Sequence, residues 1–390
     1  MISALDIRER AGEWGLSPDV VEKDYVLGWL LAGIGADPVL GRTFVFKGGT
    51  CLKKCHFETY RFSEDLDFTL IEGAPADPEG LTAAFTRVSR QLENVIGLEL
   101  PPDRFKFEVY ANPRGRPSIE GRIYYRGPLP RPAGNLPRIR LDLTSDEALV
   151  RPSVLLPVAH PYPDAGVMAG ARVRCYSYDE LFGEKLRALV ERARPRDLYD
   201  VINMYRHEPA RPPCADVVEA YQAKCRFKGI PAPLAAPDLL PEQRRRDLDA
   251  DWAPMLGHQL PELPPVKEFV AALGDLAAWL GGEAVATLPL IPVGEDVSAW
   301  TAPRMIEMWN VGFAAELIRF AGRNRLAVDL GYEGRTRLVE PYSYRRTQAG
   351  HLIFYGWNVA EGGIRAYRAD RISAVRVTGQ AFAPRFVVEF

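Results

Sequence analysis

Two aspartates spaced one residue apart open an expected strand. Asp65 and Asp67 belong to the stretch SEDLDF, and residues two apart on a strand project from the same face. Carboxylates held so close repel each other unless a cation lies between them. Mg²⁺, or Mn²⁺ in its place, takes oxygen ligands and usually arrives with the phosphates of a substrate. The pair therefore suggests metal-assisted chemistry on a phosphate ester, although Asp-x-Asp alone is more often a solvated strand end.

A third carboxylate is needed if two metal ions act together, one activating the attacking oxygen and the other steadying a triphosphate. The stretch PRIRLDLT alternates like a strand and supplies Asp142, on the same strand face as Arg140 and Thr144. We therefore expect Asp142 on a strand next to the one that carries Asp65 and Asp67.

A Gly-Gly-Thr turn precedes the aspartates. Gly48 and Gly49 stop the apolar run at 43–46 and would let the backbone approach a phosphate closely. Thr50 is expected to cap a helix over 51–58 and to add a hydroxyl and exposed N–H groups. Each signal is weak by itself, but the order of strand, glycine turn, helix and Asp-x-Asp strand predicts a site for a metal-bound nucleotide.

The elements around these residues indicate an α/β or α+β first lobe. Helices are expected at 18–34 and 82–97, and strands at 43–46, 66–70, 104–111, 120–127 and 137–144. From Tyr178 the pattern becomes helical, breaks before Pro195 and restarts there, because proline suits the first position of a helix. A proline-rich stretch and a last helix to about 281 complete a helical lobe. Beyond a linker, we expect a helix at 303–322 and several strands.

Length and composition limit the number of domains and indicate the cellular location. A chain of 390 residues is too long for one ordinary core and predicts two or three domains. We expect a catalytic lobe at 1–175, a helical lobe of the same enzyme at 176–282, a linker at 283–302 and a small β domain at 303–390. No window is apolar enough for a membrane span, and no apolar segment opens the chain, which favours the cytoplasm and no membrane partner.

Five cysteines form no CxxC pair, and five histidines form no HxxxH pair, so neither a zinc site nor a disulfide framework is indicated. Cys51, Cys55 and His56 could be metal ligands on one short helix, but the sequence offers them no distant partner set. Reduced thiols are the simpler expectation.

Several stretches resemble one known family. FKGGT and RFSEDLDF are similar to the signature of the nucleotidyltransferase superfamily, and specifically of the AbiEii/AbiGii toxin family. Three further stretches resemble that family: VEKDYVLGWLL, EKLRALVERARPRDLYD at 184–200 and DLDADWAPMLGHQLPELPP at 247–265. The resemblance spans about residues 15–280 and implies a nucleotidyltransferase fold with a helical lobe. It also implies an NTP substrate and the role of toxin in a toxin–antitoxin or phage-defence pair, with an antitoxin protein as partner.

The resemblance assigns roles in the helical lobe as well. It implies that Lys185 binds the nucleotide and that Asp197 is the remaining functional acid. The residues themselves leave an alternative open, in which Arg196 pairs with Asp200 and Asp197 only favours a helix N-terminus. If the helix continued through the proline, Lys185 and Arg192 would share a face that could meet a triphosphate.

The C-terminal stretch 337–377 resembles a WYL domain, a small Sm-like β-barrel that is generally thought to bind nucleic acid or a nucleotide-like ligand. Arg365, Arg368 and Arg371 stand at its arginine positions, whereas HLIFYGW replaces the Trp-Tyr-Leu signature. Residues 301–390 hold 13 Arg, no Lys and 8 acidic residues, so this part of the chain is positively charged. Salt-bridged surface arginines are an equal alternative, and most of the aromatic residues there are expected in the core.

The sequence therefore predicts a Mg²⁺-dependent enzyme that transfers a nucleoside monophosphate from an NTP to an acceptor hydroxyl. Some relatives modify tRNA, so RNA is the first expectation for the acceptor, with protein and small molecules as alternatives. A different class of function, a non-catalytic regulator that senses a nucleic acid or nucleotide through the C-terminal domain, is the second hypothesis.

Overall fold

In the computed structural model, the described residues are 1–390 without 58–60, 133, 208–210, 285–287, 295 and 299–312. They form two compact units, Met1–Leu181 and Phe182–Phe390. No helix in this described part is long and apolar enough to cross a membrane.

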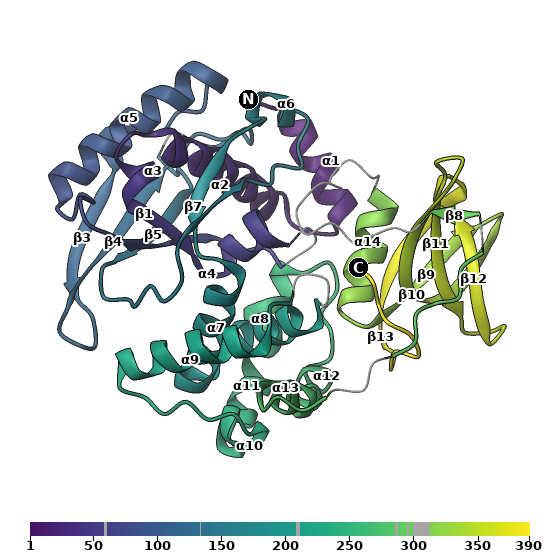
Figure 1. The fold of residues 1–390 in the computed structure, drawn as a ribbon. Helices are drawn as coiled ribbons and strands as arrows, with labels where there is room; N and C mark the ends of the chain where they lie inside the picture. Colours follow the sequence, from purple (N-terminus) through teal and green to yellow (C-terminus); the bar gives the residue numbers. More distant parts are fainter. Residues whose placement is uncertain (58–60, 133, 208–210, 285–287, 295, 299–312) are drawn as a thin grey trace. The chain divides into compact units, whose positions relative to one another are not determined.

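The first unit is a seven-stranded sheet with helices (Figure 1). Its helices are α1 (Ala4–Trp14), α2 (Pro18–Ala36), α3 (Leu40–Thr43), α4 (Gly48–Cys51), the π-helical η1 (Leu52–His56), α5 (Pro78–Ile96), the 3₁₀ turn η2 (Pro102–Arg104) and α6 (Ala165–Met168). Its strands are β1 (Phe44–Lys47), β2 (Asp65–Leu70), β3 (Lys106–Ala111), β4 (Pro117–Tyr124), β5 (Arg138–Thr144), β6 (Val154–Pro157) and β7 (Arg172–Cys175). The helices expected at 18–34 and 82–97 and the expected strands of this part are thereby confirmed. Of the helix expected at 51–58, residue 58 lies outside the described part, and the helical residues begin at Gly48. The strands β6 and β7 and the helices α1, α3 and α6 were not predicted.

The strand order is β3-β4-β5-β2-β1-β7-β6. β2 pairs with β5 and β1 pairs with β7 in parallel, and the other neighbours are antiparallel. The sheet is therefore mixed. The parallel β2 and β5 place the beginnings of both strands at the same edge.

One face of this sheet is the hydrophobic core. Phe44, Phe68 and Leu141 are fully buried on it, and the ring of Phe85 on α5 lies 6.4 Å from Phe44 and 5.5 Å from Phe107. Figure 1 shows α5 running along the sheet. Because side chains alternate along a strand, burying this face turns the odd-numbered residues of β2 to the other face.

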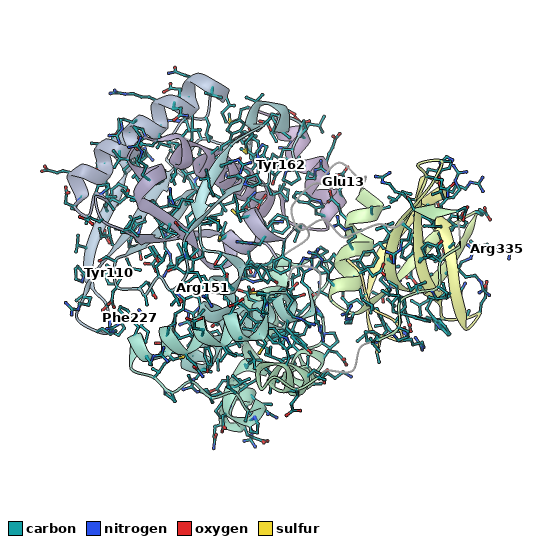
Figure 2. All side chains as sticks on the ribbon, in the orientation of Figure 1. Glu13, Tyr110, Arg151, Tyr162, Phe227 and Arg335 are labelled. Carbon is teal, nitrogen blue, oxygen red and sulfur yellow. The ribbon has the colours of Figure 1, made fainter. Side chains whose placement is uncertain are left out.

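A buried ion pair fixes α2 to the helix that follows Gly-Gly-Thr. Lys54 Nζ lies 2.7 Å from Asp24 Oδ2, and both side chains are 1% exposed. The hydroxyl of Tyr162, labelled in Figure 2, donates to the same carboxylate oxygen over 2.8 Å. Burying a charge is costly unless it is paired, so Asp24 and Lys54 depend on each other. The stretch VEKDYVLGWLL thus has a structural role.

The second unit begins within α7 (Tyr178–Arg192). The other helices are α8 (Pro195–Arg206), α9 (Cys214–Lys228), α10 (Ala236–Leu239), α11 (Glu242–Leu256), the 3₁₀ turn η4 (Gly257–Gln259), α12 (Val266–Ala271), α13 (Leu273–Leu280) and α14 (Phe313–Arg323). Ala193 has a φ of 49°, and α8 restarts at Pro195, so the expected break is confirmed. Trp252 Nε1 donates to the carbonyl of Pro264 over 2.8 Å, which closes the stretch at 247–265 on itself.

The C-terminal part holds an antiparallel sheet. Its strands are β8 (Val297–Ser298), β9 (Leu326–Tyr332), β10 (Arg335–Thr347), β11 (Leu352–Asn358), β12 (Gly363–Arg368) and β13 (Ile372–Ala381), with the 3₁₀ turn η5 (Ala369–Arg371). The order is β12-β11-β10-β9-β13, and β8 pairs with β10. Among the described residues no pairing joins β12 to β13, so the strands form a sheet that is open at both ends. Of the helix expected at 303–322, residues 303–312 lie outside the described part.

Candidate active site

The three predicted aspartates lie on neighbouring strands. In the parallel pairing of β2 with β5, Asp67 is the direct partner of Asp142, and Asp65 is the partner of Arg140. Direct partners project from the same face, so all three carboxylates share the face opposite the core. Two like charges opposite each other destabilise a sheet by themselves, and their pairing here indicates a site rather than a structural contact.

The row continues across the sheet. Lys47 on β1 is the antiparallel partner of Asp67, and Glu120 on β4 is the partner of Asp142. Lys47 Nζ also lies 3.3 Å from a carboxylate oxygen of Glu147. One row therefore runs from a lysine through two aspartates to a glutamate, with more negative than positive charge.

Burial raises the pKa of Asp142, and the nearby charges of Lys47 and Arg140 lower it in part. The hydroxyl of Tyr110 on β3 lies 3.5 Å from Asp142 Oδ1. Because burial dominates, the ionised form of this carboxylate is the costly one. An additional cation on this face would offset that cost.

The carboxylate of Asp67 lies directly against Gly48. Gly48 has a φ of 81°, a conformation that side chains other than glycine rarely adopt, and a Cβ atom built there would come closer than 3.0 Å to Asp67 Oδ2. A Cβ atom at Gly49 would come equally close to the guanidinium of Arg61. Gly48 is therefore required by its backbone conformation and by the acid next to it, whereas a side chain at Gly49 would have to displace the guanidinium of Arg61.

Thr50 differs from its prediction. It is the third residue of α4, and Lys47 occupies the N-cap position, so the expected N-cap role of Thr50 is wrong. The helix begins at Gly48 because the positive φ of that glycine turns the chain directly out of β1. The buried hydroxyl of Thr50 donates to the carbonyl of Asp65 over 2.5 Å and holds the start of β2.

Asp65 lies at the more exposed end of the site. Its carboxylate is 3.4 Å from Arg140 Nη2, and the side chains of the two residues are 33% and 52% exposed. Exposed pairs of this kind contribute little to stability, up to ~1 kcal/mol. The carboxylate can therefore exchange this partner for a ligand at small cost.

The aspartates have the donor chemistry of a magnesium site. They offer only carboxylate oxygens, which Mg²⁺ prefers, and they share one face of neighbouring strands. Their oxygen atoms do not converge on a single point: among the described residues, the one group of three or more potential ligands whose ligand atoms all lie within 4.8 Å is Cys51, Cys55 and Cys175. The aspartates thus fit the ion by type and by register.

Lys185 and Asp197 belong to the second unit, where both are paired. Lys185 Nζ lies 2.6 Å from Asp200 Oδ2, and these side chains are 8% and 0% exposed. Arg192 Nε and Nη2 donate to the two carboxylate oxygens of Asp197 over 2.7 and 2.8 Å. Each of these two basic side chains of α7 therefore meets an acid of α8 across the break at Pro195.

Comparison with known proteins decides the family. A family model described as "Nucleotidyl transferase AbiEii toxin, Type IV TA system" matches residues 29–275, which is more than half of the chain. The chain belongs to this AbiEii family. It is accordingly a nucleotidyltransferase of a type IV toxin–antitoxin family, as the signature residues predicted. No curated protein matches the sequence.

Solved structures add two similarities to this AbiEii chain. MenT4, a nucleotidyltransferase toxin from Mycobacterium tuberculosis H37Rv, is 21% identical, with a TM-score of 0.49, over 72% of this chain and 90% of that one. The proteasome accessory factor B/C (PafBC) of Arthrobacter aurescens is 14% identical, with a TM-score of 0.18, over 92% of this chain and 71% of that one.

In the C-terminal sheet, the predicted ligand arginines also have acidic partners. Arg365 lies 2.7 Å from Glu361, Arg368 lies 2.6 Å from Asp370, and Arg371 lies 3.4 Å from Glu333. As expected, most aromatic residues of this part are in the core; Tyr342, Tyr344, Tyr355 and Tyr367 are buried.

Three residues near the AbiEii signature were not predicted. Lys47 and Arg61 flank the glycines, and Tyr110, which is labelled in Figure 2, lies beside Asp142 on the edge strand β3. Lys47 could have been found from its place directly before Gly48. The other two could not, because only the folded chain brings them to the site.

Proposed function

We propose that this AbiEii protein transfers a nucleoside monophosphate from an NTP to an acceptor hydroxyl and depends on Mg²⁺, or Mn²⁺ in its place. One observation carries the proposal. Asp67 and Asp142 are direct partners on neighbouring strands and share their face with Asp65, while Gly48 packs against Asp67. Carboxylates on one face of neighbouring strands are the oxygen ligands that such a cation prefers.

Asp65, Asp67 and Asp142 would hold the metal ions. When bound, the ions supply charge neutralisation at the phosphates and activate the attacking oxygen. The protein's part is to position the groups. Thr50 fixes the start of β2 through the carbonyl of Asp65, and Gly48 leaves room for the carboxylate of Asp67.

Asp142 also suits the handling of the acceptor proton. Its carboxylate shares the face of Asp65 and Asp67, and the hydroxyl of Tyr110 lies 3.5 Å from it, so a hydroxyl on this face comes within its reach. In the proposed reaction Asp142 orients or deprotonates the attacking hydroxyl.

The phosphates of the NTP would lie against Gly48, Gly49 and Thr50. Because the hydroxyl of Thr50 already donates to Asp65, the backbone rather than that hydroxyl would face the phosphate. We further propose that Lys185 counters the triphosphate charge and that Asp197 is the remaining functional acid of the family. Asp200 would hold the ammonium of Lys185 in a fixed place, and Arg192 would do the same for Asp197.

RNA, and first tRNA, is the acceptor that we propose. The support from this chain is the surface next to Asp142: on the edge strand β3, Tyr110 lies beside Asp142 and is 43% exposed. An exposed aromatic ring beside the catalytic face offers a surface on which a base can stack. A cognate antitoxin is the proposed protein partner, and defence against phage is the proposed biological setting.

We propose that the C-terminal sheet, although open rather than the expected closed Sm-like barrel, is a WYL-like module that binds a nucleic acid or nucleotide through Arg365, Arg368 and Arg371. Their acidic partners are no obstacle, because exposed ion pairs contribute at most ~1 kcal/mol and a phosphate can replace the carboxylate.

The direct test incubates the full chain with each labelled NTP, Mg²⁺ and total RNA. Asp65→Asn should reduce label transfer by ~10³-fold or more, since a metal ligand is lost. Glu72→Gln is the matched control, because Glu72 is an exposed acid just after the same strand. Transfer to RNA that persists in Asp65→Asn, or that fails in the native chain and in Glu72→Gln alike, would contradict the proposal.

A further inference from the structure

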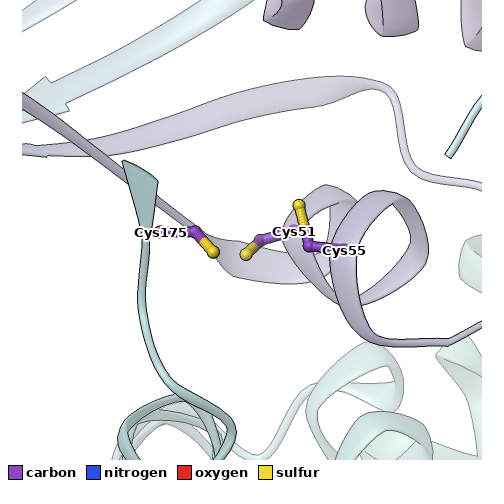
Figure 3. Close-up of side chains that lie close together, drawn as sticks. All are labelled: Cys51, Cys55 and Cys175. Atoms are coloured by element: carbon purple, nitrogen blue, oxygen red, sulfur yellow. The ribbon is translucent and has the colours of Figure 1, made fainter. Parts of the chain in front are cut away.

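Three of the five cysteines meet in the first unit. Cys51 is the last residue of α4, Cys55 lies in η1 and Cys175 ends β7, and their sulfur atoms all lie within 4.8 Å of one another. Figure 3 shows the sulfur atoms of Cys175, at the end of the strand, and Cys51 facing each other, with Cys55 next to Cys51 on the helix. The sequence interpretation grouped Cys51 and Cys55 with His56 and did not include Cys175.

Local structure explains why the thiols converge. β7 pairs with β1 in parallel, and Cys175 is the direct partner of Phe46, shortly before the glycine turn. The helix leaves β1 at Gly48, so Cys51 and Cys55 return toward the end of β7. The second cysteine lies on a π-helical turn, in which the N–H of Phe57 donates to the carbonyl of Leu52 over 2.7 Å. Such turns are rare and are often found at functional sites.

The environment of the sulfurs is that of a soft-metal site. Cys51, Cys55 and Cys175 are 0%, 1% and 0% exposed, and the group contains no carboxylate. Hydrogen bonds with the other two thiols lower the pKa of Cys175, whereas burial raises that of Cys51 and Cys55. Three sulfur ligands at ~2.3 Å from a metal in a planar arrangement lie ~4.0 Å apart. Because the three sulfur atoms already lie within 4.8 Å of one another, binding requires at most a small closure.

We propose that Cys51, Cys55 and Cys175 bind one monovalent, thiophilic cation of the Cu(I) class through three thiolates. The ion forms three metal–sulfur bonds, the protons that remain on the thiols are released to solvent, and no atom changes oxidation state. A soft cation is favoured because thiolates select Cu(I) and the three sulfur atoms are the ligand atoms that converge. The imidazole of His56 also contacts Cys175, but its Nε2 lies 3.2 Å from the carbonyl of Tyr176 and outside the sulfur group, so among the described residues the fourth ligand of a structural Zn²⁺ site is not in place.

The site would join α4 and η1, which follow β1 in the chain, to β7, which pairs with β1. Cys51 directly follows Thr50, so a bound ion would restrain the turn at Gly48–Thr50. Binding does not depend on the proposed transferase reaction, and its test needs no activity measurement.

The test titrates the full chain with Cu(I) under anaerobic conditions against a chromophoric Cu(I) chelator. The variant Cys214→Ser with Cys225→Ala keeps only the three clustered thiols and should still take up one equivalent. Adding Cys175→Ala should weaken binding by more than ~100-fold, since one of three ligands is lost. Circular dichroism of each apo variant shows whether it is folded.

A second measurement uses the native chain and so does not depend on any variant folding. X-ray absorption at the copper edge should show three sulfur neighbours at one distance. Two sulfur neighbours, nitrogen or oxygen neighbours in their place, or no competition with the chelator would overturn the proposal and leave the cluster as core packing. Zn²⁺ binding as tight as Cu(I) binding would overturn the three-coordinate assignment.

Discussion

The candidate functional residues of the two units differ in the charge of their neighbours. In the first unit, Asp67 and Asp142 are direct partners of like charge. In the second unit, Lys185 meets Asp200 and Asp197 meets Arg192. In the C-terminal sheet, Arg365, Arg368 and Arg371 each meet an acid. A fold gains stability from opposite pairs and loses it from like pairs, so the like pair needs an explanation outside the fold.

Burial divides the opposite pairs further. Asp200 and Asp197 are fully buried, whereas Arg365 and Glu361 are about half exposed. Breaking a buried pair takes an opposite charge away from a group that water cannot reach, whereas breaking an exposed pair leaves a solvated charge. The comparison therefore ranks the expected change in stability on substitution. It is largest at the buried pair of opposite charge, smaller at the pair of aspartates and smallest at the exposed pairs of opposite charge.

The largest effect on stability is expected at the buried pair. Lys185→Met should lower the free energy of unfolding by about 3–5 kcal/mol, because the carboxylate of Asp200 then loses its ammonium partner in the interior. Urea unfolding followed by circular dichroism measures this change.

The matched control is the double variant Lys185→Met with Asp200→Asn, which removes both charges and should recover most of the lost stability. It should not recover nucleotidyl transfer if Lys185 binds the nucleotide. Equal stability of the single and double variants would show that the pair does not set the stability of this helix contact.

The next effect is expected at the glycine that touches the aspartate. Gly48→Ala introduces both an unfavourable φ and a Cβ atom that overlaps Asp67 Oδ2. Gly115 has a φ of 72° and nothing within 4 Å of its Cβ position, so Gly115→Ala carries the backbone cost alone. Gly48→Ala should therefore be the less stable by about 1–3 kcal/mol, and it alone should lose transfer activity. Similar losses in both variants would mean that the contact with Asp67 is unimportant.

A part of this site could be predicted from the sequence, and the reason is periodicity. Alternation along β2 and β5 puts Asp65, Asp67 and Asp142 on the face away from Leu66 and Leu141 without knowledge of the fold. Contacts between distant segments could not be predicted in this way. Cys175 reaches Cys51 only because β7 adds to the sheet beside β1, and this short strand gave no signal.

The prediction for Thr50 failed for a related reason. Sequence rules place a threonine at the N-cap, but Gly48 starts the helix two residues earlier and the hydroxyl finds a carbonyl on β2. The contact of Lys185 with Asp200 crosses a helix break, so the i,i+4 rules that apply within one helix do not predict it.

A smaller effect, of opposite sign, is expected for the like pair. The pKa of Asp142 is raised in the folded chain, so ionisation of this carboxyl group costs stability. The protonated form is therefore the more stable one, and its extra stability is lost as the pH rises through the raised pKa. Asp142→Asn should therefore increase the free energy of unfolding near neutral pH, toward the low end of the ~0.5–2 kcal/mol range of stabilising substitutions.

The gain in Asp142→Asn should disappear below the ordinary aspartate pKa of ~3.9, where the native carboxyl group is protonated as well. Unfolding curves of both proteins across this pH range measure the difference, and transfer activity should fall although stability rises. A loss of stability at neutral pH would show that Asp142 has a structural rather than a functional role.

The smallest effect is expected at the exposed pairs of the C-terminal sheet. Arg365→Gln should change the free energy of unfolding by less than ~0.5 kcal/mol, because the partner Glu361 remains in water when the arginine is lost. If the sheet binds a phosphate-bearing ligand through its arginines, the same variant should weaken binding of a fluorescent oligonucleotide, and the weakening should diminish at high salt. A stability loss above ~1 kcal/mol with unchanged binding would place Arg365 with the structural pairs of the helical part.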